Sequence, residues 1–486
     1  MRRKKVARLL WKLRAMRRSC PRRDQLLLRL GAAKKEAGGA ARFVQVQVPP
    51  EGQPVTRQSF HFQVDKPKLQ KAEAQDGHYL LRSNLVGENP AVLWERYVQL
   101  THIEAAFKTL KSELGIRPLL EGQAEGLNLI NLLAAQWGDL FTNVGDLPQG
   151  PIASHDGETM VWPGTENRQH ILGHLCLLGG HGEPVFPMSA AGPDESYLGD
   201  PLWTSLADWL DACRKRGGLA VTAHFPYPIA EVGADIVLGK SDALEIYPDF
   251  GTGFDNPRFI HWYHALSCGY RLPVVGGTDK MGAYMAVGAN RTYAYLGQNE
   301  FSFANWAQAV RKGNTFMTSG PLLTLRADGR VPRDVITLGA GGGKVEVEAS
   351  AQCFAPLHRI EIVMNGKIVA SHEEPNGAHQ LKLHEQIQVP GPAWIAARCL
   401  STLGPTTDWH FKVLAHTSPV YLDVPGQEVF SAPAAAFLMT LIEGAETWVN
   451  NLATPSDPES MARIRQTYRE ARQRLHHKMH AHGLAH

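Results

Sequence analysis

The sequence predicts an α/β fold for the central part of the chain, followed by a small β-sandwich and a helical tail. Between Leu127 and about Leu325, continuous apolar runs alternate with helical stretches, which is typical of a parallel sheet buried on both faces. From 335 to 425 the pattern changes to short strands in which apolar and polar residues alternate. From about Ser431 onward the pattern is helical. We expect four parts, 1–118, 119–330, 331–425 and 426–486.

The first 118 residues differ from the rest of the chain in charge. They contain 24 lysines and arginines against 10 aspartates and glutamates, a net charge of +14, whereas the remainder carries −11. A block this basic indicates either a polyanionic partner, usually nucleic acid, or a solvated basic arm.

The elements of this basic part follow from its apolar periodicity. Residues 1–37 predict one or two basic helices, and residues 42–64 predict two strands with one face in solvent. Residues 76–85 predict a turn that leads into a third strand. Residues 89–115 begin with an Asn–Pro helix start and keep a helical apolar period, which predicts one long helix.

Apolar runs define the elements of the other parts. The runs "TMVWPG", "HLCLLGG", "LAVTAHF", "ALEIYP" and "LPVVGGTD" predict strands, and "PLWTSLADWLDACRKRGG" and "NPRFIHWYHALSCG" predict helices. In the sandwich, "HRIEIVMNGKIVAS" predicts a hairpin with a type I′ turn at Asn365–Gly366. In the tail, Pro458 and Glu459 predict the first turn of the last helix.

The cysteines and the hydropathy bear on the compartment. Six cysteines are far apart and form no CxxC pair, which indicates a reduced, cytoplasmic protein. No apolar run reaches the ~18 residues of a membrane helix, and the basic N-terminus is not followed by the apolar stretch of a secretory signal. We therefore expect no membrane anchor.

Ionisable side chains recur at the ends of the predicted strands. Glu166, His224, Glu245 and Asp279 close apolar runs, and His174 opens one. Carboxyl ends of parallel strands meet at one face, so we expect these side chains to lie close together. Imidazoles and carboxylates are ligands for Zn, Mn or Fe, and such an ion activates water for the hydrolysis of a small-molecule substrate. Each residue taken alone is more typical of a structural hydrogen bond, a turn or a helix N-cap than of a metal ligand. Their recurrence at several strand ends is what favours a metal site, and Glu245 stays open between the two roles.

Other polar groups give weaker indications. Side chains near the predicted ligands could support them or contact a substrate, namely Arg168, His170, His181 and Lys280. The run "GAGGGK" lacks the spacing of a phosphate loop and predicts a turn. Four histidines at helical spacing in the tail could bind a metal, although their pattern is more typical of an exposed helix end, namely His476, His477, His480 and His482.

Residues 2–118 resemble the C-terminal part of DDE transposases of bacterial insertion sequences. The segment "ERYVQLTHIEAAFKTLKSELGIRP" carries Tyr97, Glu104 and Lys111 at the spacing of the Y-x2-R-x3-E-x6-K signature, with Leu100 at the arginine position. The resemblance implies an α+β, RNase H-like fragment in which Glu104 is the third acid of an Mg-dependent catalytic triad and Lys111 contacts DNA phosphate. The two aspartates of the triad would precede this segment, so we expect no transposition from this chain alone, and only nonspecific DNA binding through residues 1–118.

From about Leu127 onward the chain resembles the CehA/McbA family of metallohydrolases, which are related to PHP-type barrels. The resemblance lies in "EGLNLINLLAAQWGD", "GTENRQHILGHLCLLGG", "VTAHFPYP", "VVGGTDKMGAY" and "AHTSPVY". It implies a distorted (β/α) barrel without its first strand, an appended β domain, and a metal site formed by four ligands, Glu166, His174, His224 and Asp279.

One part of the CehA/McbA pattern is missing from this chain. The family's opening strand carries a His-x-His pair, but no such pair occurs before Glu166: His102 lies in the transposase-like helix and His155 stands alone. We therefore expect a fusion whose larger part is an impaired metal-dependent hydrolase acting on an ester, carbamate or phosphoester. The alternatives are a transposase-derived DNA-binding protein and a non-functional product of an insertion event.

Overall fold

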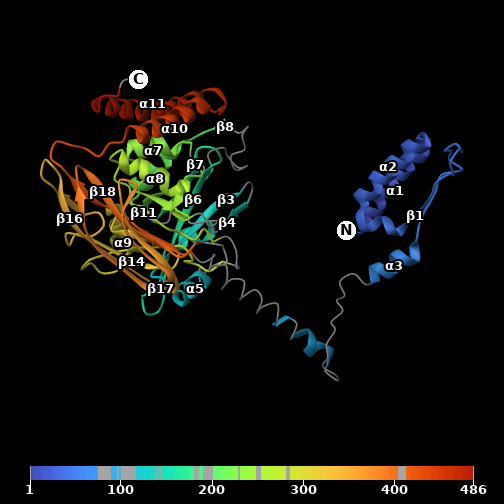
Figure 1. Cartoon of the computed structure of the whole chain (residues 1–486). Coiled ribbons are helices and arrows are strands. Elements are labelled where there is room, and N and C mark those ends of the chain that lie inside the picture. The colour runs from blue at the N-terminus through green and yellow to red at the C-terminus, as the bar shows by residue number, and fades with distance from the viewer. Residues whose placement is uncertain are drawn as a thin grey trace. The chain divides into compact units, whose positions relative to one another are not determined.

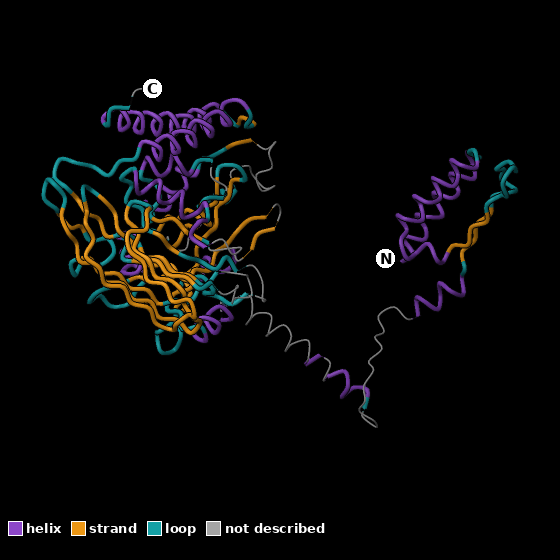
Figure 2. Tube along the Cα trace, in the orientation of Figure 1, coloured by secondary structure: helices purple, strands orange, loops and turns teal. Residues whose placement is uncertain are grey.

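The structure is a computed structural model that divides the chain into two compact units, Met1–His102 and Ile103–His486 (Figures 1 and 2). The structure describes residues 2–74, 89–95, 98–99, 116–137, 140–142, 144–179, 185–189, 201–227, 230–247, 253–280, 285–402 and 412–484.

The first unit consists of helices and a two-stranded antiparallel sheet. The apolar faces of its first two helices meet in a core that contains Leu9, Leu13, Leu26 and Phe43, which leaves their basic side chains at the surface. The predicted basic helices and the two predicted strands are confirmed. The elements are α1 (Arg2–Ser19), α2 (Arg23–Ala37), the 3-10 helix η1 (Gly38–Phe43), β1 (Val44–Gln47), β2 (His61–Val64) and α3 (Lys66–Ala74).

Several expectations for the basic part lie outside the described residues. These are the third strand at 76–85 and most of the long helix at 89–115, of which residues 90–95 are described and helical. Glu104 and Lys111, the two transposase-type site residues, also lie outside the described residues.

The second unit begins with a mixed eight-stranded sheet and its flanking helices (Figure 1). The strand order is β11-β10-β9-β7-β6-β3-β4, and β5 pairs with β6. The strands are β3 (Leu129–Trp137), β4 (Leu140–Thr142), β5 (Ile152–Ala153), β6 (Met160–Gln169), β7 (Gly173–Leu178), β9 (Leu219–Phe225), β10 (Ala243–Ile246) and β11 (Val274–Val275). The helices are α5 (Ile116–Ala124), α6 (Leu206–Lys215), α7 (Val232–Leu238), α8 (Pro257–Ser267) and α9 (Phe303–Lys312).

The prediction of a parallel sheet is confirmed for β3, β6, β9, β10 and β11, which run in the same direction. It is wrong for β4, β5 and β7: β4 is antiparallel to β3, β5 to β6, and β7 to both β6 and β9. For β7 the reason is the connection: only residues 170–172 separate it from β6, and a crossover to a parallel strand needs about a dozen residues or more.

The eight-stranded sheet is open over the part of the chain that the structure describes. Its strand order ends at β11 on one side and at β4 on the other, and these two strands do not pair with each other. The unit is therefore mixed α/β with several sheets, and its described strands do not close the barrel that the resemblance implies.

Residues 291–423 contain the strands of one connected nine-stranded sheet. Two of its strands, of 22 and 23 residues, are much longer than the short strands predicted for the sandwich. The predicted type I′ turn between them is confirmed, because Asn365 and Gly366 both have positive φ angles, +48° and +80°. The strands are β12 (Arg291–Ala294), β13 (Thr315–Thr318), β14 (Leu322–Ala327), β15 (Val335–Thr337), β16 (Gly343–Met364), β17 (Lys367–Val389), β18 (Ala393–Leu400), β19 (Leu414–Thr417) and β20 (Val420–Asp423).

Two long helices close the second unit, α10 (Ala432–Asn451) and α11 (Pro458–Ala481), and both pack against α7 (Figure 1). The predicted start of the last helix is confirmed: Asp457 caps it by accepting hydrogen bonds from the backbone N–H groups of Glu459 and Ser460. β8 (Pro201–Leu202) and β21 (Thr454–Pro455) form a short two-stranded parallel sheet.

Two further expectations concern the thiols and the membrane. All six cysteines are free, in agreement with the absence of disulfides that their spacing predicts. Among the described helices, none combines the length and the apolar character needed to cross a bilayer.

Candidate metal centre

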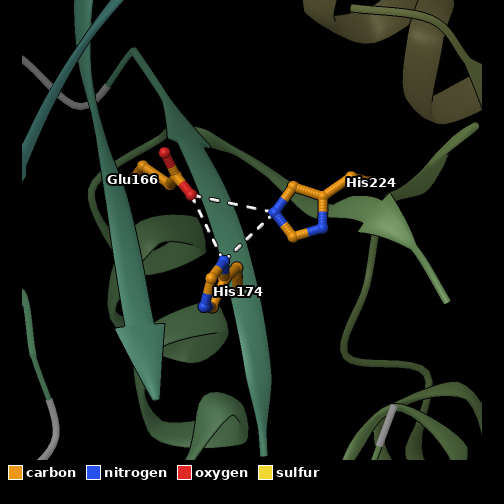
Figure 3. A group of neighbouring side chains, drawn as sticks. All are labelled: Glu166, His174 and His224. Atoms are coloured by element: carbon orange, nitrogen blue, oxygen red, sulfur yellow. Dashed lines mark hydrogen bonds and ion pairs between the residues drawn. The ribbon is translucent and has the colours of Figure 1, made fainter. Parts of the chain in front are cut away.

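Three of the four predicted ligands converge at one edge of the mixed sheet (Figure 3). Nδ1 of His174 lies 3.1 Å from Nε2 of His224 and 3.4 Å from Oε1 of Glu166, and Nε2 of His224 lies 3.8 Å from the same Oε1. A tetrahedral zinc ion with bonds of about 2.1 Å separates its ligand atoms by roughly 3.4 Å. The three donor atoms therefore have the spacing of three corners of a metal tetrahedron.

The directions of the strands explain this convergence. β6 and β9 end at the same edge of the sheet, because both are antiparallel to β7. Glu166 lies near the end of β6 and His224 near the end of β9, while His174 lies at the start of β7, directly opposite Arg168. A strand running in the opposite direction thus brings its first residues, rather than its last, to the site.

Glu166 is the anionic member of the cluster. Its buried side chain accepts a hydrogen bond from Nη2 of Arg168 at 2.9 Å. Burial opposes ionisation, but hydrogen bonds from His174 and His224 and the charge of Arg168 outweigh it and hold the pKa of Glu166 well below its usual range. Glu166 is therefore ionised at neutral pH and offers a negatively charged oxygen.

The surroundings of the two imidazoles shift their pKa values in opposite directions. Burial is the largest influence on His174 and lowers its pKa, so its ring is neutral at neutral pH. Burial also opposes the charged form of His224, but the nearby carboxylates of Glu166 and Glu245 outweigh this and raise its pKa. Nδ1 of His224 donates to the carbonyl of Tyr227, which leaves Nε2 as the nitrogen that faces Glu166 and His174.

Glu245 supports the site through the backbone. Its Oε2 accepts a hydrogen bond of 2.8 Å from the N–H of His224, a residue with the unfavourable positive φ of +29°. Its Oε1 lies so close to Gly277 that a Cβ added there would be 1.9 Å away. Burial raises the pKa of Glu245. The residue that the sequence left open is therefore a positioning residue, and Gly277 makes room for it.

Asp279 lies outside the cluster of three donors, which are all within 4.8 Å of one another. Its charge is nevertheless coupled to the site: desolvation, followed by repulsion from Glu166, raises the pKa of Asp279. Its backbone has a positive φ of +51°. The role of Asp279 as a fourth ligand stays a prediction.

The other polar residues that the sequence suggested differ in their contacts and exposure. Arg168 contacts Glu166 directly, as described above. Nζ of Lys280 contacts the carbonyl of Met285 and lies 3.4 Å from Oε2 of Glu121. His170 is exposed, and His181 lies outside the described residues.

Sequence reasoning missed Tyr227 and Arg258. Nη1 of Arg258 donates to the backbone carbonyl of His224 at 3.3 Å, and its guanidinium lies 5.8 Å from the ring centre of Tyr227 and 5.7 Å from that of Tyr247. Arg258 thus contacts the backbone carbonyl of His224, and Tyr227 contacts the His224 ring through its own backbone carbonyl. Contacts through backbone groups leave no pattern in the sequence.

A second group of possible ligands lies on the long hairpin. Glu346, Glu348 and His384 are all exposed, and Nε2 of His384 lies 2.7 Å from Oε1 of Glu346. Full exposure makes this an ordinary surface ion pair, in contrast to the buried Glu166 with its two half-buried histidines.

Comparisons of the chain with family models, with curated proteins and with solved structures gave no match. The assignment of function therefore depends on the chemistry and geometry of the site itself.

Proposed function

We propose that the second unit is a metal-dependent hydrolase whose ion is held by Glu166, His174 and His224. The observation that carries the proposal is the triangle of donor atoms, with sides of 3.1, 3.4 and 3.8 Å. The resemblance to the CehA/McbA metallohydrolases supports the same reading and adds the expectation of an ester, carbamate or phosphoester substrate.

The donor set suits Zn, Mn or Fe in the divalent state. Two imidazoles and one carboxylate are the protein ligands of many catalytic zinc sites, which keep a further position open. When bound, the ion would supply a Lewis acid and an activated water for hydrolysis. The net charge of such an ion with one carboxylate is +1, which favours substrates that develop negative charge.

The surrounding residues keep the donors in place. Arg168 orients the carboxylate of Glu166 through its 2.9 Å hydrogen bond, and Glu245 fixes the backbone of His224. The Tyr227 carbonyl selects the tautomer of His224 that presents Nε2. Each of these contacts acts before any substrate binds, so the site is preorganised.

The proposal is tested by metal analysis of chain produced without an added histidine tag, followed by assays with aryl ester, carbamate and phosphoester substrates. We expect about one bound Zn, Mn or Fe per chain, lost in His174→Ala and His224→Ala and retained in the control His155→Ala, since His155 is exposed and stands apart from the cluster. Metal at trace level in the wild type, or undiminished in His174→Ala, would overturn the proposal.

A second function is favoured for the first unit, namely nonspecific binding of nucleic acid. α1 has nine lysines and arginines and no acidic residue, and four of its apolar side chains, those of Val6, Leu9, Leu13 and Met16, are buried in the core. Several of the basic residues are exposed, among them Lys4, Lys5, Arg14 and Arg18. A helix with one basic face suits contacts with phosphates, in line with the resemblance of residues 2–118 to a transposase fragment.

A further inference from the structure

The last turns of α11 carry two histidines on one face of the helix. His476 and His480 are one turn apart, and their Nε2 atoms lie 3.2 Å from each other. Their ring centres are 4.3 Å apart with an interplanar angle of 69°. Both side chains are exposed. The helix α11 that carries them leads to the C-terminus of the chain (Figure 1).

This spacing is the one that a shared metal ion requires. An ion with bonds to nitrogen of about 2.0–2.1 Å separates two neighbouring ligands by roughly 2.9 Å in square-planar or octahedral geometry and by roughly 3.4 Å in tetrahedral geometry. The observed 3.2 Å lies between these values. Little rearrangement of the two rings would be needed to bind an ion.

The helix that carries the pair is held firmly by its opposite face. Leu475 and Met479, the immediate neighbours of the two histidines in the sequence, are fully buried in the core between α7, α10 and α11, as is Tyr468 two turns earlier. Because the backbone is fixed by this packing, binding of an ion would order only two exposed side chains.

The nearby histidines have different surroundings. His482 stacks on Phe430 with ring centres 4.0 Å apart, and its Nε2 lies 3.6 Å from Oε2 of Glu428. His477 follows His476 directly and is therefore rotated by about 100° around the helix from it. The 3.2 Å spacing thus distinguishes His476 and His480 from the rest of the histidine-rich end.

The face of His476 borders a cavity in the helix pair. A cavity of about 560 Å³ lies between α10 and α11, and Glu443 of α10 and His476 of α11 both line it. The exposed sides of the two imidazoles leave room for water ligands.

We infer that His476 and His480 form a surface site for a borderline divalent cation such as Ni²⁺, Cu²⁺ or Zn²⁺. Imidazole nitrogens suit these ions, and affinity rises from Ni²⁺ to Cu²⁺ and falls again at Zn²⁺. The site is separate from the Glu166 centre and does not depend on the proposed hydrolase.

The experiment titrates full-length, untagged chain with Ni²⁺ by calorimetry and compares the wild type with His476→Gln/His480→Gln. We expect the double variant to lose one equivalent of bound Ni²⁺ and to elute earlier from an immobilised Ni²⁺ column. Glutamine is a good helix former, so circular dichroism should be unchanged. An identical Ni²⁺ stoichiometry and elution in the double variant would overturn the inference.

A matched control keeps the number of histidines constant. His480→Gln/Arg469→His moves the second imidazole to an exposed position seven residues from His476, about 10 Å away along the helix and beyond the reach of a shared ion. We expect this variant to behave like the double variant, and the control His477→Gln/His372→Gln, in which both replaced residues are exposed, to behave like the wild type. Retention that follows only the histidine count would contradict a site.

A spectroscopic readout separates a chelate from loose binding. The measurement uses chain that carries His174→Ala and His224→Ala, so that the Glu166 centre contributes no nitrogen. Cu²⁺ held by both rings of the surface site should then show splitting from two nitrogens in its electron paramagnetic resonance spectrum, and the further change His480→Gln should remove the contribution of one of them. Two-nitrogen splitting that persists unchanged in His480→Gln would contradict the assignment.

Discussion

The hydroxyl of Tyr263 on α8 lies 2.6 Å from Nε2 of His416 on β19. Nδ1 of His416 is engaged by the Thr417 carbonyl at 2.8 Å, so Nδ1 carries the proton and Tyr263 donates to Nε2. The same hydroxyl accepts from Nη1 of Arg398 at 3.2 Å, and Nε of Arg398 donates to Oε2 of Glu361 at 2.5 Å. A buried polar network thus joins a helix of the mixed sheet to the nine-stranded sheet.

Tyr263→Phe should destabilise the second unit by about 1–3 kcal/mol, because Nε2 of His416 would be left buried without a donor. Urea unfolding of the full chain measures the change. Tyr293→Phe is the control, since Tyr293 is partly exposed and only stacks on Phe316, and it should stay within about 0.5 kcal/mol of the wild type. Equal stability of the two variants would contradict the network.

His416 should also make stability depend on pH. Burial, followed by the charge of Arg398, lowers the pKa of His416 to about 3, below its value of 6.5 in the unfolded chain. As pH falls below 6.5, the unfolded chain takes up a proton that the folded chain does not, so stability falls down to about pH 3. Between pH 7 and pH 5 the loss from this group is about 2 kcal/mol.

The measurement is the free energy of unfolding of wild type and His416→Gln at pH 7 and pH 5. The variant is expected to be less stable at pH 7 but to lose about 2 kcal/mol less between the two pH values. The exposed His372→Gln serves as the reference and should keep the slope of the wild type. A slope in His416→Gln equal to that reference would show that His416 titrates normally.

Removal of the Glu245 carboxylate should weaken metal binding without removing a ligand. Glu245→Ala leaves the N–H of His224 without its acceptor, and we expect the affinity for Zn²⁺ to fall about 10- to 100-fold. Glu245→Gln retains an oxygen acceptor and should fall much less. Competition with a coloured chelator measures both, and equal losses in the two variants would indicate that the charge, rather than the hydrogen bond, matters.

Gly277→Ala should reproduce the effect of Glu245→Ala, because the new Cβ would lie 1.9 Å from Oε1 of Glu245 and displace it. In a chain that already carries Glu245→Ala, the same change should cost little further Zn²⁺ affinity, since contacting residues are not additive. Gly341→Ala is the control, since no atom lies within 4 Å of a Cβ there. Full additivity of the two losses would contradict a shared mechanism.

Neutralising exposed basic residues of α1 should weaken DNA binding in a salt-dependent way. In the full chain, Lys4→Gln/Lys5→Gln/Arg14→Gln/Arg18→Gln should reduce the slope of log affinity against log salt by about 1 for each side chain that contacts phosphate. Fluorescence anisotropy with duplexes of two unrelated sequences provides the measurement. An unchanged slope would assign the binding to another surface or exclude it.

Local patterns in the sequence were sufficient where one physical rule dominates. Asn365–Gly366 fits a type I′ turn because both residues tolerate positive φ, and Pro458 fits only the first turn of a helix. The convergence of Glu166, His174 and His224 was also predicted, although through a parallel arrangement that the structure corrects.

Long-range and backbone-mediated contacts were beyond sequence reasoning. The direction of β7 depends on the shortness of residues 170–172. The apolar pattern of the two strands does not show whether a tight turn or a crossover joins them. The supports from Arg258 and Tyr227 reach His224 through carbonyl groups, which every residue type possesses. The distance of Asp279 from the three donors depends on the path of the backbone after β11. The residue types in the sequence do not determine that path.

The brevity of residues 170–172 has a consequence for how the site assembles. Glu166 and His174 belong to one hairpin, so these two donors meet as soon as a local, low-contact-order element forms. His224 lies on β9, fifty residues after His174 in the sequence, so its contact with the other two donors closes a much longer loop. A cation bound to all three donors would therefore link the β6–β7 hairpin to β9. Raising the concentration of this cation should slow unfolding and raise the melting temperature of the mixed sheet.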